Sequence, residues 1–266
     1  MVAFDIDGTL VPDGGINVPD ETVEVMTATT RAGHHIVLAT GRSLAGALPV
    51  AQALGLEDAT IAASNGAITA NLDAAWPGGY QIQHCHTLAA GPVLRLARDL
   101  GADLQVAAED VGWGYHVSEI FSPGRLNGRQ YLVGESELHR VQTPRLVLAG
   151  PDVATLARDA VAALGVTVNA VGPHWLDVTP PGVSKATALE AVRAELGVAA
   201  EHTVFVGDGV NDLPALAWAA RSVAMGQAPD KVRRAAHHVT GTLEENGAVA
   251  VLHELLGVPA ISGAAS

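Results

Sequence analysis

A pair of aspartates close to the start of the chain has the residue types and the spacing of a reaction centre. Residues 1–4 are apolar and lead directly into Asp-Ile-Asp-Gly-Thr-Leu at residues 5–10. Such an apolar run is typical of a buried strand of a parallel sheet, and ligands bind just beyond the carboxyl ends of these strands. Asp5 and Asp7 are therefore predicted to lie at a site. Gly8 allows the chain to leave the strand sharply, because glycine accepts backbone angles that other residues avoid.

Polar residues also follow or begin other predicted elements, and together they indicate phosphoryl chemistry. They are Thr40 after an apolar run at 36–39, Lys185 at the start of a helix, and Asp208, Asn211 and Asp212 after a predicted buried strand at 203–206. Several carboxylates at one sheet edge repel each other, and a divalent cation such as Mg²⁺ relieves that repulsion. A lysine and a threonine near the cation suit the oxygens of a phosphoryl group.

The two carboxylates of the first pair can divide such a reaction between them. One can attack phosphorus and form an acyl phosphate. The other, two residues away, can protonate the leaving oxygen and later activate the water that hydrolyses the intermediate.

Alternating strands and helices are predicted around these residues. Helices at 19–32 and 44–54 separate strands at 1–4, 36–39 and 60–63, and the same rhythm resumes with a helix at 184–196, strands at 203–206 and 222–225, and helices at 229–236 and 244–256. This order predicts an α/β fold with a doubly wound, Rossmann-like parallel sheet. The tail from residue 259 is small and polar, and we expect it to be frayed.

The middle of the chain breaks the rhythm and indicates an inserted domain. An edge strand at 80–87, a helix at 88–100, strands at 104–108, 145–149, 166–171 and 175–178, and a helix at 153–164 predict a small α/β cap with an antiparallel sheet, whereas residues 109–142 look irregular. We expect a discontinuous core of residues 1–75 and 178–266 and a cap of residues 76–177.

Composition excludes several classes of protein. The net charge is −13 and there is no basic stripe, which argues against a nucleic-acid or anionic-membrane partner. No apolar run is long enough for a membrane span, and nothing reads as a secretion signal. The single cysteine, Cys85, excludes an internal disulfide framework and fits a reducing compartment, so a cytoplasmic location is expected.

The four groups of polar residues, taken in order, resemble the four motifs of the haloacid dehalogenase (HAD) superfamily. The matching segments are Asp-Ile-Asp-Gly-Thr-Leu at 5–10, Thr-Gly-Arg at 40–42, Gly-Val-Ser-Lys ending at Lys185, and Gly-Asp-Gly-Val-Asn-Asp at 207–212. The long insert between the second and third motifs, and Ser-Asn-Gly-Ala at 64–67, are similar to the Cof-like branch, which has a large α/β cap. One departure is that only four residues precede Asp5, which makes the first strand short for this family.

The resemblance implies a role for each motif residue. Asp5 would be the nucleophile and a Mg²⁺ ligand, Asp7 the general acid/base with its backbone carbonyl on the metal, and Asp208 the third protein ligand. Phosphate would be held by Ile6, Thr40, Gly41, Lys185 and Asn211. Asp212 would orient Lys185 or a metal-bound water. Transport ATPases of the superfamily carry threonine where Asp7 stands, so hydrolysis or mutase-like transfer is favoured here.

These implications lead to a Mg²⁺-dependent phosphatase that acts on a small phosphate monoester, such as a sugar phosphate or a related metabolite. A phosphomutase or phosphotransferase would use the same two aspartates and stays open. A non-catalytic module that binds phosphorylated metabolites also stays open, although the intact set of acids disfavours it. A dinucleotide-binding dehydrogenase is disfavoured because no Gly-x-Gly-x-x-Gly follows a strand.

Substrate contacts from the cap are predicted in its irregular stretch. The candidates are Trp113, Tyr115, His116, Glu119, Arg125 and Arg129, of which the arginines could bind a substrate carboxylate or a second phosphate. Asn65-Gly66 is most simply a turn, with a substrate contact as the alternative. His84-Cys85-His86 makes a poor zinc site, because adjacent ligands lack a partner pair.

Overall fold

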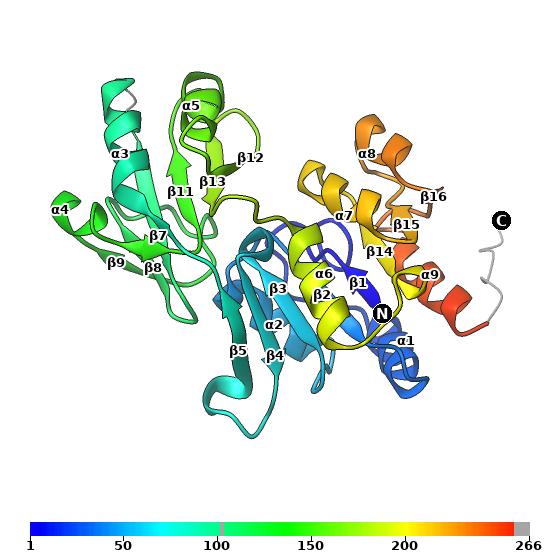
Figure 1. The fold of residues 1–266 in the computed structure, drawn as a ribbon. Coiled ribbons are helices and arrows are strands. Elements are labelled where there is room, and N and C mark those ends of the chain that lie inside the picture. Colours follow the sequence, from blue (N-terminus) through cyan, green and yellow to red (C-terminus); the bar gives the residue numbers. More distant parts are fainter. Residues whose placement is uncertain (102–103, 258–266) are drawn as a thin grey trace.

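The computed structural model describes residues 1–101 and 104–257, which form two α/β bodies side by side (Figure 1). The larger body contains an eight-stranded sheet in the order β16-β15-β14-β1-β2-β3-β4-β5. Its strands are β1 (Val2–Phe4), β2 (Ile36–Ala39), β3 (Thr60–Ala63), β4 (Ile68–Leu72), β5 (Tyr80–Cys85), β14 (Val204–Gly207), β15 (Arg221–Ala224) and β16 (His238–Val239). The six strands from β16 to β3 are parallel, and β4 and β5 continue the sheet in antiparallel pairing.

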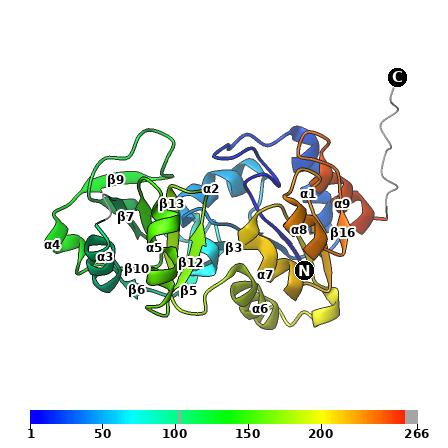
Figure 2. The same cartoon turned by 90° about the horizontal axis from the view of Figure 1, so that it is seen from above.

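The parallel strands wind outward from β1 in both directions, which confirms the doubly wound fold predicted from the sequence. The helices of this body are α1 (Asp20–Arg31), α2 (Leu44–Ala53), α6 (Lys185–Glu195), α7 (Leu213–Trp218), α8 (Asp230–Ala235) and α9 (Gly247–Leu255). Apolar residues of α1, α2 and α9 pack on one face of the sheet, and those of α6 and α7 on the other (Figure 2). Val232 of α8 belongs to the same apolar cluster as α6 and α7. With both faces covered, the central strands β1, β2 and β14 consist of continuous apolar runs.

The smaller body, the cap, has a six-stranded sheet in the order β12-β13-β11-β7-β8-β9. Its strands are β7 (Gln105–Asp110), β8 (Gly114–Val117), β9 (Arg129–Leu132), β11 (Leu146–Ala149), β12 (Thr167–Ala170) and β13 (Trp175–Thr179). Helices α3 (Ala90–Asp99) and α5 (Val153–Ala162) pack on one face of this sheet. The cap also holds α4 (Glu135–Leu138) and a two-stranded pair of β6 (Leu88–Ala89) with β10 (Gln142–Thr143).

The structure differs from the sequence prediction in the stretch 109–142. Two strands and the short helix α4 lie there, and β8 pairs with β7 antiparallel and with β9 in parallel. β8 and β9 are only four residues long and are separated by eleven residues that include one proline and two glycines, so no local periodicity marks them. The pairing of these strands with a sheet assembled from distant segments stabilises them.

The strand pairing favours a boundary between core and cap at other residues than those expected from the sequence. β5, which the sequence analysis assigned to the insert, pairs along its whole length with β4 in the core sheet. At the other end, β13 stays in the cap sheet as far as Thr179. We therefore propose a core of residues 1–85 and 180–257 and a cap of residues 86–179. The predicted frayed tail from residue 259 lies outside the described residues.

No helix in the described part of the chain is long and apolar enough to cross a membrane.

Candidate active site

The carboxyl ends of three adjacent strands bring the motif residues together. Asp5 follows β1, Thr40 follows β2 and Asp208 follows β14, and these strands are neighbours in the order β14-β1-β2. The backbone amide of Asp5 donates to the Val206 carbonyl at 2.9 Å, which anchors the aspartate to the neighbouring strand. Side chains far apart in the sequence therefore meet at one edge of the sheet, as expected for a doubly wound fold.

Lys185 enters this edge from the first turn of α6 and forms the central ion pairs of the site. Its Nζ lies 2.7 Å from Asp5 Oδ1 and 2.6 Å from Asp212 Oδ1, and the side chain is fully buried. Ser184 starts α6 with a capping box that includes Thr187, which fixes where the lysine leaves the helix. Burial disfavours the charged lysine, but the carboxylates of Asp212 and Asp5 outweigh it and hold the pKa of Lys185 above its ordinary value.

Asp212 lies fully buried behind the site and uses both carboxylate oxygens to position other groups. Oδ1 accepts from Lys185, and Oδ2 accepts from the backbone amides of Asp208 at 3.0 Å and Gly209 at 2.8 Å. The orienting role expected for Asp212 from the sequence would use these contacts and stays a prediction. Asp5 and Asp208, which lie beside Asp212, line the cavity described below, whereas Asp212 is not part of its lining.

The electrostatics of the cluster favour a cation. One oxygen from each of Asp5, Asp208 and Asp212 lies within 4.8 Å of the others, and Lys185 is the single ammonium against these three carboxylates. Burial, with the charge of Asp212 next, raises the pKa of Asp5 well above its ordinary value and that of Asp208 to about 6. Carboxylates crowded in this way bind hard divalent cations through oxygen. The donor set therefore fits a metal such as Mg²⁺.

The close approach of Asp208 to the first motif depends on Gly8. A Cβ on Gly8 would lie 2.3 Å from Asp208 Oδ2, and the residue has a φ of +75°. Thr9 is the next residue, and its hydroxyl donates to Asp208 Oδ1 at 3.3 Å. A side chain at position 8 would thus push the Asp208 carboxylate away from that of Asp5, and these two carboxylates could hold the metal.

Asp7 is held by Arg42, the last residue of the Thr-Gly-Arg motif. Arg42 Nη2 lies 2.6 Å from Asp7 Oδ1 and Nε lies 2.8 Å from Oδ2, a two-bond pairing that fixes the plane of the carboxylate. The Gly14 amide donates to Asp7 Oδ1 at 2.8 Å. The sequence analysis quoted Arg42 as part of a motif but gave it no role.

The phosphate-binding candidates surround this edge. Thr40 is fully buried, Gly41 and Asn211 line the cavity, and Ile6 is buried between the two aspartates. Asn211 Nδ2 donates to Asn65 Oδ1 at 2.9 Å. Ser64, Asn65 and Gly66 all have positive φ, so the predicted turn is a strained one that points the Asn65 side chain toward the site.

A cavity of about 870 Å³ lies over this edge, between the core and the cap. On the core side it is lined by Asp5, Asp7, Asp13, Gly14, Gly41, Arg42, Asn65 and residues 208–211. On the cap side it is lined by residues 124–127, Arg145, Arg158, residues 168–171, residues 173–175 and Asp177. The volume suits a small metabolite.

Of the cap residues predicted to contact substrate, the structure brings Arg125 to this cavity. Its guanidinium lies 4.8 Å from the ring centroid of Trp175, which also lines the cavity. The others lie outside the cavity lining: Tyr115 is buried beneath Arg145, His116 packs edge-on against Tyr131, and Trp113, Glu119 and Arg129 are exposed. Trp175, Arg145 and Asp177 were missed, because the sequence presents them as parts of ordinary strands.

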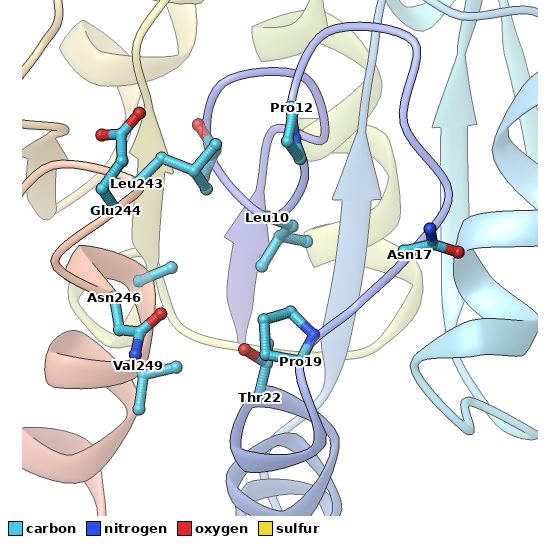
Figure 3. A pocket seen from close by; sticks show the side chains of 11 residues that line it. Leu10, Pro12, Asn17, Pro19, Thr22, Leu243, Glu244, Asn246 and Val249 are labelled. Atoms are coloured by element: carbon cyan, nitrogen blue, oxygen red, sulfur yellow. The ribbon is translucent and has the colours of Figure 1, made fainter.

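A second cavity, of about 350 Å³, opens on the other side of the loop that follows Asp7 (Figure 3). It lies between this loop, the start of α1 and residues 243–249, and Leu10, Pro12, Pro19, Leu243 and Val249 supply its apolar walls. Its lining contains none of the residues predicted for catalysis or phosphate binding. The larger cavity is therefore the candidate active site.

A family model for haloacid dehalogenase-like hydrolases matches residues 2–120 and 149–252. The chain belongs to this family. The match spans most of the core and both ends of the cap, so the family, the fold and the enzyme class predicted from the sequence are confirmed.

Individual relatives agree with the family. The chain is 25% identical to the 5-amino-6-(5-phospho-D-ribitylamino)uracil phosphatase YitU of Bacillus subtilis, over 96% of each chain. It is 28% identical to a phosphoglycolate phosphatase of Aeropyrum pernix, over 97% of this chain and 93% of the relative. A solved HAD subclass IIB sugar phosphatase superimposes with a TM-score of 0.78 at 25% identity, over 96% of this chain and 98% of that one.

Proposed function

We propose that this HAD-family phosphatase hydrolyses a small phosphate monoester through an aspartyl-phosphate intermediate, with Mg²⁺ as cofactor. The observation that carries the proposal is the buried Asp5, held by Lys185 and facing a cavity that core and cap line together. A carboxylate fixed in one orientation against a cation is prepared for attack on phosphorus.

In the proposed reaction, Asp5 attacks phosphorus while the substrate oxygen departs. Lys185, Thr40 and the Gly41 amide hold the phosphoryl oxygens, and Asn211 reaches the same group. The proton for the leaving oxygen comes from Asp7, which then takes a proton from the water that hydrolyses the acyl phosphate. Its position in the wall of the cavity supports this assignment.

Asp5, Asp208 and the Asp7 backbone carbonyl would hold the Mg²⁺, which neutralises charge on the phosphoryl group when bound. Asp212 supports the site from behind through Lys185 and the Asp208 amide.

The substrate is proposed to be a phosphorylated metabolite small enough for the cavity. The named relatives act on phosphorylated small molecules, and the cap wall offers a guanidinium over an indole ring at Arg125 and Trp175. This pair can pack on the leaving group of the substrate.

The experiment is a panel of sugar phosphates and aryl phosphates assayed with Mg²⁺ for released phosphate. We expect turnover by the wild type, loss with EDTA, recovery on adding Mg²⁺, and no turnover by Asp5→Asn with the thermal unfolding transition retained. The matched control Asp58→Asn changes an exposed aspartate and is expected to keep activity. Wild-type activity in Asp5→Asn would refute the proposed nucleophile, and transfer of the phosphoryl group to a second alcohol would indicate a mutase.

A further inference from the structure

Five buried polar residues outside the four motifs form a cluster between the cap and the core. We name Ser64, Glu109, Tyr115, Arg145 and Asp177 the cap–core junction. Glu109, Tyr115 and Asp177 lie on strands β7, β8 and β13 of the cap sheet. Arg145 directly precedes β11 of the same sheet, and Ser64 comes from the core. All five are less than 9% exposed. Buried charges of this kind are costly unless they are paired, so their placement calls for a physical reason.

The junction binds the core at segments that follow β2 and β3. Glu109 accepts a hydrogen bond from the Ser64 hydroxyl. It also accepts one from the backbone amide of Leu44, the first residue of α2, at 3.3 Å. Arg145 Nη1 donates to the backbone carbonyl of Gly41. The two cap residues act together, because the Glu109 amide donates to the Arg145 carbonyl at 2.9 Å.

The contact of Arg145 with Gly41 falls on the peptide that also holds Thr40. The carbonyl of the Gly41–Arg42 peptide accepts from Arg145, and its N–H donates to Thr40 Oγ1 at 3.0 Å. A hydroxyl oxygen that accepts a bond from this amide keeps its own proton free, and that proton has no acceptor among the described residues. Bonds in series polarise one another, so the cap guanidinium strengthens the bond made to Thr40.

The other partners of Arg145 hold its guanidinium in place. Nη2 donates to the Tyr115 hydroxyl, Nη1 lies 3.5 Å from Asp177 Oδ2, and Nε lies 3.6 Å from Glu109 Oε2. Nε has no hydrogen-bond partner among the residues that the structure describes, and the side chain lines the cavity. Asp177 is held in turn, since Trp175 Nε1 donates to its Oδ1 at 2.9 Å.

The geometry points to Arg145 as a positioning residue: the cap guanidinium fixes the Gly41 peptide and, through it, directs the Thr40 hydroxyl toward the phosphoryl group. The inference rests on the proposed phosphatase function and extends it, because the phosphate-binding loop of the core is then complete only with the cap in place. Binding of the phosphoryl group then depends on Arg145 to the same extent for every substrate. The leaving group is contacted by other cap residues, such as Arg125 and Trp175.

The test measures competitive inhibition by inorganic phosphate, with an aryl phosphate as substrate and Mg²⁺ present. In Arg145→Met we expect the inhibition constant for phosphate to rise about tenfold, because the Thr40 hydroxyl loses its fixed direction and with it about one net hydrogen bond to phosphate. Arg145→Lys keeps the positive charge between Glu109 and Asp177 and is expected to fall between wild type and Arg145→Met. The lysine variant carries the test if the methionine variant does not fold.

The matched control is Arg140→Lys, an exposed cap arginine that is expected to leave the phosphate constant unchanged. The ratio of kcat/KM between an aryl phosphate and a sugar phosphate should stay within about twofold in the Arg145 variants, because one shared hydrogen bond is weakened for both. An unchanged phosphate constant, with or without a lower melting temperature, would overturn the inference. A changed ratio would show instead that Arg145 contacts the leaving group. Absence of turnover in the wild type would refute the proposed function itself.

Discussion

Removing the Lys185 ammonium tests whether the site is held together by its buried ion pairs. In the wild type, Lys185 Nζ lies 2.7 Å from Asp5 Oδ1 and 2.6 Å from Asp212 Oδ1. Lys185→Met keeps an apolar side chain of similar length but leaves the two carboxylates facing each other without a cation. Breaking a buried pair by deleting one partner costs about 3–5 kcal/mol. The protein has only two lysines, and Lys231 is exposed, so Lys231→Met is a matched control.

The pH dependence of this loss has a defined sign. The pKa of Asp5 is already raised by burial, and Lys185 opposes that rise. Without the lysine, the folded protein holds a proton on Asp5 more tightly than the unfolded chain does, so stability increases as the pH falls toward the folded pKa. The deficit of Lys185→Met should therefore be largest near neutral pH and shrink in mildly acidic buffer.

The assay is urea unfolding with EDTA present, compared across pH. We expect Lys185→Met to lose about 3–5 kcal/mol at neutral pH and Lys231→Met less than about 0.5 kcal/mol. The double variant Lys185→Met/Asp212→Asn should recover part of the loss, because one unpaired carboxylate is removed. Equal stabilities of the two lysine variants at neutral pH, or a deficit that grows on acidification, would refute the reasoning.

Two further predictions concern the proposed metal site. Burial and the charge of Asp212 raise the pKa of Asp208 to about 6, so protons should compete with Mg²⁺ for this carboxylate below that pH. The Mg²⁺ concentration for half activation should then rise up to about tenfold for each pH unit below 6. A half-activating concentration that stays constant from pH 7 to pH 5 would contradict this prediction. Gly8→Ala should destabilise the protein by about 1–3 kcal/mol and raise the half-activating Mg²⁺ concentration, because its Cβ would meet Asp208 Oδ2 at 2.3 Å. Gly197→Ala, at a φ of +65° with open space around it, should cause backbone strain alone; equal Mg²⁺ effects in both variants would exclude the steric explanation.

The sequence by itself determined the fold class and which residues meet at the core edge. Asp5, Thr40, Lys185 and Asp208 each stand at the boundary of a short apolar run or a capped helix, and the doubly wound topology places such boundaries at one edge. Local pattern and order are therefore sufficient to bring these residues together, whereas the structure added the ion pair of Lys185 with Asp5.

Only the tertiary structure decided how the cap meets this edge. Arg145 lies 104 residues from the Gly41 carbonyl that it binds, and nothing local distinguishes it from Arg129, which is exposed on β9. Tyr115 looked like a substrate contact but is buried against Arg145, and β5 joined the core sheet instead of the insert. The physical reason is that hydrogen bonds and ion pairs depend on distance in space: the motif residues are brought together by adjacent strands, whereas the partners of the cap residues are set by the packing of two separate sheets.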